Sequence, residues 1–571
     1  MVQTKYKENS IINLNKDSSN KYNKKNFNKN AIQTLLCLFI ILCPIFDILS
    51  FITRNTWHSI ISASTFIRPI IPVFVGMYIF IKADKKEKKL LIILAISYIL
   101  YAIIHLAIMK SLIMGCSYGN VISELQYVFN YTFLIIYFII YTYTFALKSK
   151  NESEIKHNLS KLQNSIVIMN FIYIISIYVS ILIGKSSPTY TETGVGYKGF
   201  IESGNSLSAI LILSTFITLY VIKDNFKMIK LYFQSKENTK FELKENSKFE
   251  LKENLDFQLT EKAKFDSNNA NEKDNGAIKQ NIFKTRYKKN AIMFVIAIFT
   301  YILTSIYLIK LIGTRTGLLG TIIVLFVFIL ADVIINKNKK IAVMGFTIIC
   351  IIVLFVAMFG SNTIKRRKEV NLSQYTIIDE KTGEIGTMTG DMLRIKNKIL
   401  DNNLEEGYMS EAQKQSVIDL YNYTQKHNIA GNNTRKQQLM YNIFLVKNQR
   451  NIITILFGNG FKTNFREMVM ENELASMILN FGIIGFILYI GPFATVLIYS
   501  IYVAIKEKRI DFEYFILQCA LGLSFVLSWM TGYVFFATSC MIVIVVIATM
   551  LICKTYRAKG EIEWRKQLEE E

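Results

Sequence analysis

Residues 434–485 read TRKQQLMYNIFLVKNQRNIITILFGNGFKTNFREMVMENELASMILNFGIIG, and this stretch indicates how the rest of the chain is organised. It begins polar and basic, passes through 458–461 (GNGF) and carries two carboxylates at Glu471 and Glu473. A long apolar run then opens with 482–485 (GIIG). We therefore expect a polar loop that places charged side chains at the mouth of a membrane helix.

The composition is that of a membrane protein. Of the 571 residues 51% are hydrophobic, and the mean hydropathy of +0.30 is unusual for a soluble chain. Apolar runs of about 20 residues recur, which is the length that crosses a bilayer as a helix. We expect an all-α polytopic membrane protein with about 12 spans, at 31–52, 61–81, 90–109, 123–147, 164–184, 205–222, 289–311, 317–335, 341–359, 473–504, 512–530 and 532–553.

The net charge of +23 is best explained by membrane orientation. Lysines cluster in short loops at 82–89, 148–150, 336–340 and 506–509, which fall on one side if the spans alternate. The positive-inside rule makes that side cytoplasmic. We therefore expect both termini in the cytoplasm, a location in the plasma membrane and no nucleic-acid partner, with residues 360–472 as one large extracytoplasmic loop between spans nine and ten.

These expectations divide the chain into segments. Gly491-Pro492 predicts a kink in the tenth span. Phe recurs at every eighth position from 241 to 265; we interpret this repeat as a solvated tether, with a partner-docking segment as the alternative. The segments are a disordered N-terminus (1–30), spans one to six (31–222), a cytoplasmic insert (223–288), spans seven to nine (289–359), the large loop (360–472), spans ten to twelve (473–553) and a cytoplasmic tail (554–571).

No pattern indicates a disulfide framework, a metal site or a cofactor. Six of the seven cysteines lie in apolar runs, and the chain has no CxxC motif. The four histidines are scattered along the chain. We expect no metal and no cofactor.

Charged side chains at the ends of spans are the first functional candidates, because a charge in a membrane is costly. Asp47 and Arg68 fall at the outer ends of the first two spans, as a structural pair or as part of a site. Arg315 lies among small residues in 311–320 (LIGTRTGLLG), which leaves room for a bulky anion. Asn205 opens span six, either as a helix cap or beside free N–H groups that bind an anion.

The large loop supplies further candidates. Arg435 opens an expected amphipathic helix over 435–448, which we expect to lie along the membrane surface. Glu471 and Glu473 either stabilise the start of the next helix or include a general base. The expected apolar face of the amphipathic helix carries Leu439, Ile443 and Val446.

Taken in order, these motifs resemble the O-antigen ligase and O-antigen polymerase superfamily, in the form common in Gram-positive bacteria. The resemblance implies about twelve spans with one large external loop between spans nine and ten. Ligases of this superfamily carry a catalytic His where this chain has Glu471, which favours a polymerase or another glycan transferase over a lipid A-core ligase. The matching positions are Arg315 in GTRTG, Arg435, Gly458 with Gly460, 204–208 (GNSLS) and 482–485 (GIIG).

The resemblance implies an enzyme that transfers a glycan from an undecaprenyl-diphosphate carrier to an acceptor hydroxyl. Because the sequence shows no metal-binding cluster, we expect this enzyme to act without a metal. Arg315 and Arg435 are expected to hold the diphosphate, because arginine binds phosphate with two donors and keeps its charge. Glu471 is the expected base. The weaker candidates, for substrate binding, are Arg68, Lys198, Asn205 and Glu473.

Two other classes remain open. A lipid-linked oligosaccharide flippase or other multi-span transporter fits the number of spans, although the two halves show no repeat of the kind found in many carriers. A structural or sensory membrane protein fits the long loop and the Phe repeat. Neither class explains why the candidate residues gather on one face of the membrane.

Overall fold

The computed structural model describes most of the chain. Within the described residues the only sheet is a two-stranded hairpin, and helices make up nearly all the rest, so the expected helical membrane class is confirmed. The described residues are 29–54, 63–112, 121–149, 151–190, 194–201, 203–242, 272–336, 361–366, 390–429, 433–461, 470–508 and 510–570, with single residues 345, 348, 388 and 468.

Nine helices in the described residues are long and apolar enough to cross a membrane, which makes the chain an integral membrane protein. The helix α2 (Ala63–Lys82) covers the second expected span, whereas the ninth, 341–359, lies almost wholly outside the described residues. The nine are Lys29–Arg54, α3 (Lys85–Leu112), α4 (Val121–Thr142) with η1 (Tyr143–Leu147), α5 (Glu152–Leu182), α6 (Gly204–Glu242), α8 (Glu272–Ile306) with η2 (Tyr307–Leu311), α9 (Arg315–Asn336), α19 (Phe512–Met530) and α20 (Thr538–Glu570).

The expected tenth span, 473–504, is divided into three helices. The first is a short helix, α16 (Glu473–Asn480). Phe481 follows it, and the chain then turns at Gly482, whose φ is +74°. The helices α17 (Gly482–Tyr489) and α18 (Gly491–Lys506) then meet at 55°. The kink predicted at Gly491-Pro492 is confirmed; proline lacks the N–H that a continuous helix needs.

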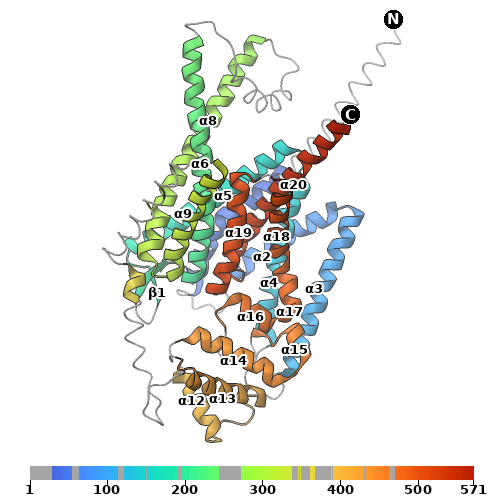
Figure 1. Cartoon of the computed structure of the whole chain (residues 1–571), viewed down its shortest axis with the longest axis vertical. Coiled ribbons are helices and arrows are strands. Elements are labelled where there is room, and N and C mark those ends of the chain that lie inside the picture. Colours follow the sequence, from blue (N-terminus) through green and yellow to red (C-terminus); the bar gives the residue numbers. More distant parts are fainter. Residues whose placement is uncertain are drawn as a thin grey trace.

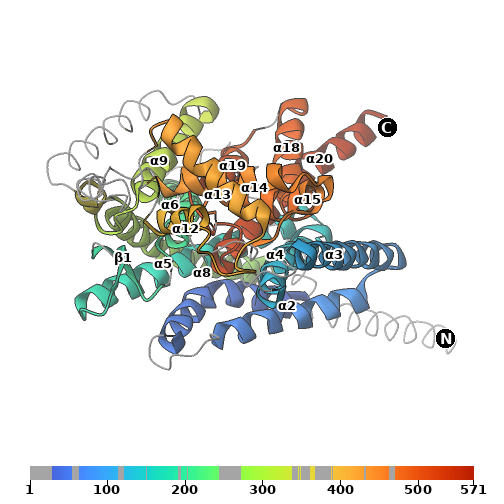
Figure 2. The same cartoon turned by 90° about the horizontal axis from the view of Figure 1, so that it is seen from below.

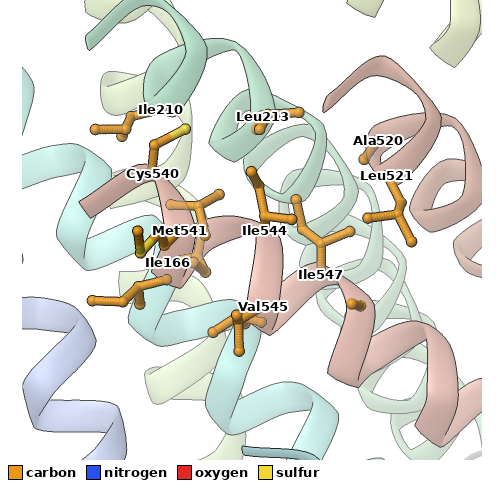
Figure 3. Close-up of a cluster of buried hydrophobic side chains, with 14 of the residues drawn as sticks. Ile166, Ile210, Leu213, Ala520, Leu521, Cys540, Met541, Ile544, Val545 and Ile547 are labelled. Atoms are coloured by element: carbon orange, nitrogen blue, oxygen red, sulfur yellow. The ribbon is translucent and has the colours of Figure 1, made fainter. Parts of the chain in front are cut away.

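Helix α20 is buried at the centre of the bundle. Its residues 540–551 are apolar around nearly the whole circumference, and none is more than 1% exposed. A helix of this kind is stable only when other elements surround it. Figure 3 shows this packing: Met541, Ile544 and Ile547 of α20 lie among Ile166 of α5, Ile210 and Leu213 of α6, and Ala520 and Leu521 of α19.

At one end of the bundle, helices α6 and α8 run side by side and extend past the other spans (Figure 1). The ring of Tyr232 stacks on that of Tyr287 there, with centroids 4.0 Å apart. Residues 243–271, which hold nearly all of the Phe repeat, lie outside the described residues.

The large loop lies at the opposite end, below the bundle in Figure 1 and toward the viewer in Figure 2; we call this the loop side. Its helices are α12 (Gly390–Leu400), α13 (Glu411–Lys426), α14 (Thr434–Gln449) and α15 (Ile452–Phe457). They share a small core of their own, formed by Met388, Met392, Leu393, Met409, Val417, Leu420, Tyr441, Leu445 and Met468.

The helix expected over 435–448 forms, but its buried face is not the one expected. Tyr441 and Leu445 are buried in the loop core, whereas Ile443 is 40% exposed. Helix α13 supplies the apolar partner, and burying the large Tyr ring removes more apolar surface from water than burying an Ile. The helix is therefore part of a packed subdomain.

The loop is fastened to the bundle by direct contact between two backbone segments. The N–H of Gly460, after α15, donates to the carbonyl of Asn480, at the end of α16, over 2.8 Å. A Cβ on Gly458 would lie 2.0 Å from that carbonyl oxygen, and a Cβ on Gly482 would lie 2.5 Å from the Gly458 nitrogen. These glycines are required because no side chain fits between the two segments.

We predict that Gly458→Ala destabilises the fold far more than Gly184→Ala. Both glycines have positive φ, at +88° and +65°, where Ala costs about 1 kcal/mol or more. Gly458 also has a ψ of 167°, a combination that is essentially confined to glycine. Gly184 has open space around it, so it bears only this cost, whereas Gly458 adds a backbone clash. Thermal unfolding of the two purified variants in detergent checks this; equal shifts would contradict the contact.

Candidate functional site

A β-hairpin covers the mouths of two spans on the loop side. Strand β1 (Ser187–Tyr190) pairs with β2 (Val195–Gly199) in antiparallel register, with Tyr190 opposite Val195. A Cβ on Gly196 would lie 2.3 Å from the carbonyl oxygen of Ile312, just before α9. A Cβ on Gly204, at the start of α6, would lie 2.7 Å from the side chain of Thr189. The hairpin is thus pressed against the first turns of α6 and α9.

The first turn of α9 places Arg315 at this mouth. The hydroxyl of Thr314 accepts a hydrogen bond from the N–H of Gly317 over 3.0 Å and lies 2.9 Å from the hydroxyl of Ser208 on α6. These contacts cap α9 and hold it beside α6. Arg315 is the next residue, and its side chain is exposed.

A second arginine, Arg366, approaches from the segment that follows. Its guanidinium lies 3.5 Å from the ring centroid of Tyr190, and its Nη1 donates to the Tyr190 hydroxyl over 2.6 Å. The side chain of Asn362, four residues earlier, donates to the carbonyl of Leu311 over 2.8 Å. The segment 361–366 is therefore held against the α9 mouth, and Arg366 against the hairpin.

Electrostatic effects show that these groups form one cluster. Burial lowers the pKa of Arg366; the charges of Arg315 and Arg435 lower it further, while Tyr190 and Glu471 raise it. Burial raises the pKa of Tyr190, and the same three arginines oppose that rise. Each charge must lie near both groups to act on them. We call this set the arginine cluster: Arg315, Arg366 and Arg435, with Glu471 and Tyr190.

Arg435 and Glu471 form an ion pair in this cluster. The Nε of Arg435 lies 2.8 Å from Oε2 of Glu471, and its Nη1 donates to the carbonyl of Met530 over 2.7 Å. The two side chains are 42% and 41% exposed. A pair this exposed contributes only about 0–1 kcal/mol, because water competes for both charges. The pair can therefore open at little cost.

Glu473, two residues later, has a different environment. It is 4% exposed, and its two carboxylate oxygens accept five hydrogen bonds. Every lone-pair direction of the carboxylate is used, so Glu473 has no capacity left for a substrate. Its role is to hold other elements together. The donors are the hydroxyls of Tyr131 on α4 and Ser528 on α19 and the N–H groups of Val534, Phe535 and Phe536.

A small cavity is lined by both carboxylates. Its volume is about 20 Å³, which is room for about one water molecule. Half of its wall is aromatic, and Glu471 and Glu473 lie at its polar part. The residues that line it are Tyr127, Tyr131, Phe461, Met470, Glu471, Glu473, Ser476, Gly532, Tyr533 and Phe536.

The remaining predicted residues lie at other positions. Arg68 pairs with Asp47 over 2.6 Å, and the hydroxyl of Ser539 donates to the same carboxylate over 2.7 Å. Lys198 lies on β2 of the hairpin. Asn205 is the second residue of α6 and is half-buried. The structure thus brings Arg315, Arg435 and Glu471 together, and gives Arg68 a carboxylate partner inside the bundle.

A buried ionisable pair was not singled out from the sequence. Nε2 of His105 on α3 lies 3.0 Å from Oε1 of Glu124 on α4, and Nδ1 lies 2.7 Å from the carbonyl oxygen of Phe457, the last residue of α15. Ionisable residues inside apolar runs are a signal that could have indicated both. The pair supports the end of α15. It is not part of a metal site: no group of three or more His, Cys, Asp or Glu side chains in the described residues is placed to hold a metal ion.

Comparison with known proteins gives one match. The family described as O-antigen ligase like membrane protein matches residues 29–236 and 280–557. Every member of the arginine cluster lies inside the matched ranges, whereas the whole Phe repeat falls between them. No curated protein and no solved structure matches the chain.

We predict that Glu473→Gln lowers stability by about 2–4 kcal/mol, because an amide nitrogen faces donors that a carboxylate oxygen accepted. Glu471→Gln, the matched control two residues away, should change stability by less than about 1 kcal/mol. Thermal unfolding in detergent measures both, and limited proteolysis of the 531–537 loop reports the site of the damage. A Glu473→Gln variant as stable as wild type would contradict the structural role.

Proposed function

Because the chain belongs to the O-antigen ligase-like membrane protein family, we propose that it transfers a glycan from an undecaprenyl-diphosphate carrier to an acceptor hydroxyl. Membership makes the protein a glycosyltransferase-type membrane enzyme of the glycan ligase or polymerase class. Beyond this family assignment, we propose the undecaprenyl-diphosphate donor, the reaction and the side of the membrane on which it occurs. The loop side faces outward from the plasma membrane, and both termini are cytoplasmic.

The observation that carries the proposal is the charge of the arginine cluster. Three guanidinium groups and one carboxylate leave two net positive charges at one membrane mouth. A diphosphate that joins a lipid to a glycan carries two negative charges, so the cluster neutralises it. A guanidinium also offers paired donors that match phosphate oxygens.

The position of the cluster also supports a lipid-linked donor. Arg315 opens a membrane span, and Arg366 and Arg435 belong to the adjoining loop segments. A polyprenyl chain would stay in the bilayer while its diphosphate reaches this boundary. The glycan would then extend toward the loop helices, away from the hydrocarbon.

The reaction that we propose is a displacement at the anomeric carbon. The acceptor oxygen forms a new bond to that carbon, the bond from carbon to the diphosphate oxygen breaks, and the diphosphate leaves with the electron pair. Arg315, Arg366 and Arg435 stabilise the charge that develops on the leaving group. Glu471 accepts the proton of the acceptor hydroxyl.

Because the Arg435–Glu471 ion pair is weak, the proposed reaction has a defined sequence of steps. An arriving diphosphate offers Arg435 a stronger partner than a half-exposed carboxylate, and breaking the pair costs about 1 kcal/mol or less. Glu471 is then free to accept a proton. The donor should therefore bind before the acceptor is activated.

Glu471 also bears on the choice between ligase and polymerase. The superfamily resemblance places a His at this position in ligases, so we propose a polymerase or another glycan transferase. Transport of a lipid-linked oligosaccharide is the competing function, since the bent pair α17–α18 is the kind of discontinuity that carriers use. A reconstituted assay separates the two, because transport moves the glycan without forming a bond.

We predict that Arg315→Ala and Arg366→Ala each lower glycan transfer by about 100-fold or more, because each removes a charge that stabilises the leaving group. Lys447→Ala is the control: Lys447 is exposed at the far end of α14, and its loss should leave transfer unchanged. Transfer is measured in vesicles with purified protein, lipid-linked donor and acceptor. Wild-type turnover in both arginine variants, with normal membrane insertion, would refute the proposed role.

We further predict that Glu471→Gln lowers transfer by about 100-fold, the usual contribution of a general base. Glu471→His should keep part of the activity, because imidazole can also accept a proton at this place. The same vesicle assay measures both variants. Full activity of Glu471→Gln would show that the base is another group.

A further inference from the structure

Helix α15 places apolar side chains on the outside of the large loop. Four of its six residues are exposed, and Ile452 is 70% exposed. We propose that α15 is a membrane anchor, which inserts these side chains among the acyl chains of the leaflet on the loop side. The inference rests on the membrane location of the protein and not on the proposed reaction. The four residues are Ile452, Ile453, Ile455 and Leu456.

The depth of α15 follows from its contact with the span α3. Between Lys89 and Lys110 this span has no Lys, Arg, Asp or Glu, and a run of about 20 such residues matches the thickness of the hydrocarbon. His105 precedes Lys110 by five residues, which places it about 8 Å inside that end of the run. Nδ1 of His105 lies 2.7 Å from the carbonyl oxygen of Phe457, the last residue of α15. The end of α15 is therefore held at a depth where hydrocarbon surrounds the protein.

The rest of α15 cannot lie far from this level. A helix of six residues is only about 9 Å long. The segment that follows it is also packed on α3: a Cβ on Gly460 would lie 3.0 Å from Cγ of Met109, which is the last residue before Lys110. Figures 1 and 2 both show α15 against the loop-side end of α3. The whole helix thus lies in the outer part of one leaflet.

The two helices beside α15 have exposed apolar side chains of their own. On α3 these include Ile99 and Ile103, and on α17 they include Ile487. The hydroxyl of Tyr101 on α3 donates to the carbonyl of Phe481, directly before α17, over 2.6 Å, so the two helices adjoin. Exposed apolar side chains on membrane-spanning helices are covered by lipid. The apolar surface of α15 therefore extends a lipid-facing surface that already exists.

Another helix of the same loop shows what a water-facing surface looks like. Every exposed side chain of α13 is polar or charged, as at Glu411, Gln415 and Lys426. The residues just before α15, Arg450 and Asn451, are exposed and polar as well. The change from polar to apolar surface thus falls at the first residue of α15, as expected where a chain passes from the headgroups into the acyl chains.

The anchor bears on the site through the chain itself. Helix α15 leads directly into Gly458, whose close contact with the end of α16 fastens the loop to the bundle. Lipid contact at α15 fixes the level of this contact relative to the membrane. The loop helices above it are then held at a constant height over the span mouths.

The test uses the full-length protein in nanodiscs whose phospholipids carry bromine on their acyl chains, because bromine quenches tryptophan fluorescence on contact. The tested variant is Ile453→Trp. Ile103→Trp on α3 is the lipid-facing reference, and Gln415→Trp on α13 is the water-facing reference. Iodide in the buffer is the second quencher. The signal of each introduced tryptophan is the difference from wild type, which contains the three native tryptophans.

We expect brominated lipid to quench Ile453→Trp by the same fraction as Ile103→Trp, with little effect of iodide, and Gln415→Trp to show the reverse. Bromine near the glycerol end of the acyl chain should quench Ile453→Trp more than bromine near its methyl end, because α15 lies in the outer part of the leaflet.

Quenching of Ile453→Trp by iodide and not by lipid would overturn the anchor. Protection from both quenchers, with two copies of the protein in each nanodisc by mass, would assign the surface to a second copy and would also overturn it. If Ile453→Trp does not fold, Ile452→Trp repeats the measurement at a more exposed position of the same helix.

Discussion

The carboxylate of Glu473 is the contact on which the arrangement of the loop side depends. It accepts hydrogen bonds from α4, from α19 and from three successive N–H groups before α20, and all of these elements are distant from it in sequence. A buried carboxylate without donors would be strongly unfavourable, so these elements must meet there for the chain to fold. Glu471, two residues earlier, and Tyr533, one residue before the N–H groups, are positioned by the same contact.

Two carboxylates separated by one residue thus have opposite properties. Glu473 is enclosed and fully bonded, while Glu471 is half-exposed and shares one ion pair with Arg435. Because of this difference in environment, the hydrogen bonds to Glu473 cost much free energy to break, whereas the Arg435–Glu471 ion pair costs little. A rigid anchor beside an exchangeable ion pair suits a site that must keep its shape while its charges change partners.

The arginine cluster requires close approach between segments that are far apart in the chain. The hairpin reaches the α9 mouth because Gly196 has no side chain, and the loop reaches α16 because Gly458 and Gly482 have none. A bundle centred on α20 holds the spans behind these contacts. The glycines at these contacts and the buried helix α20 together allow Arg315, Arg366 and Arg435 to meet at the same span mouth.

The sequence by itself determined the features that follow from local rules. Apolar runs of membrane length predicted the helical class, Gly491-Pro492 predicted the bend between α17 and α18, and the charges at span mouths indicated Arg315, Arg435 and Glu471 as candidates. Helical periodicity and the cost of a charge in hydrocarbon act on neighbouring residues, so they can be read from the order of the chain.

Only the tertiary structure decided which side chains meet. It separated Glu473 from Glu471, brought Arg366 onto Tyr190 and paired His105 with Glu124. It also turned Tyr441 of α14 toward the loop core, where the sequence pattern favoured another face. Each of these contacts joins residues that are distant in the chain, and their energies depend on burial and on available donors, which exist only once the helices have packed.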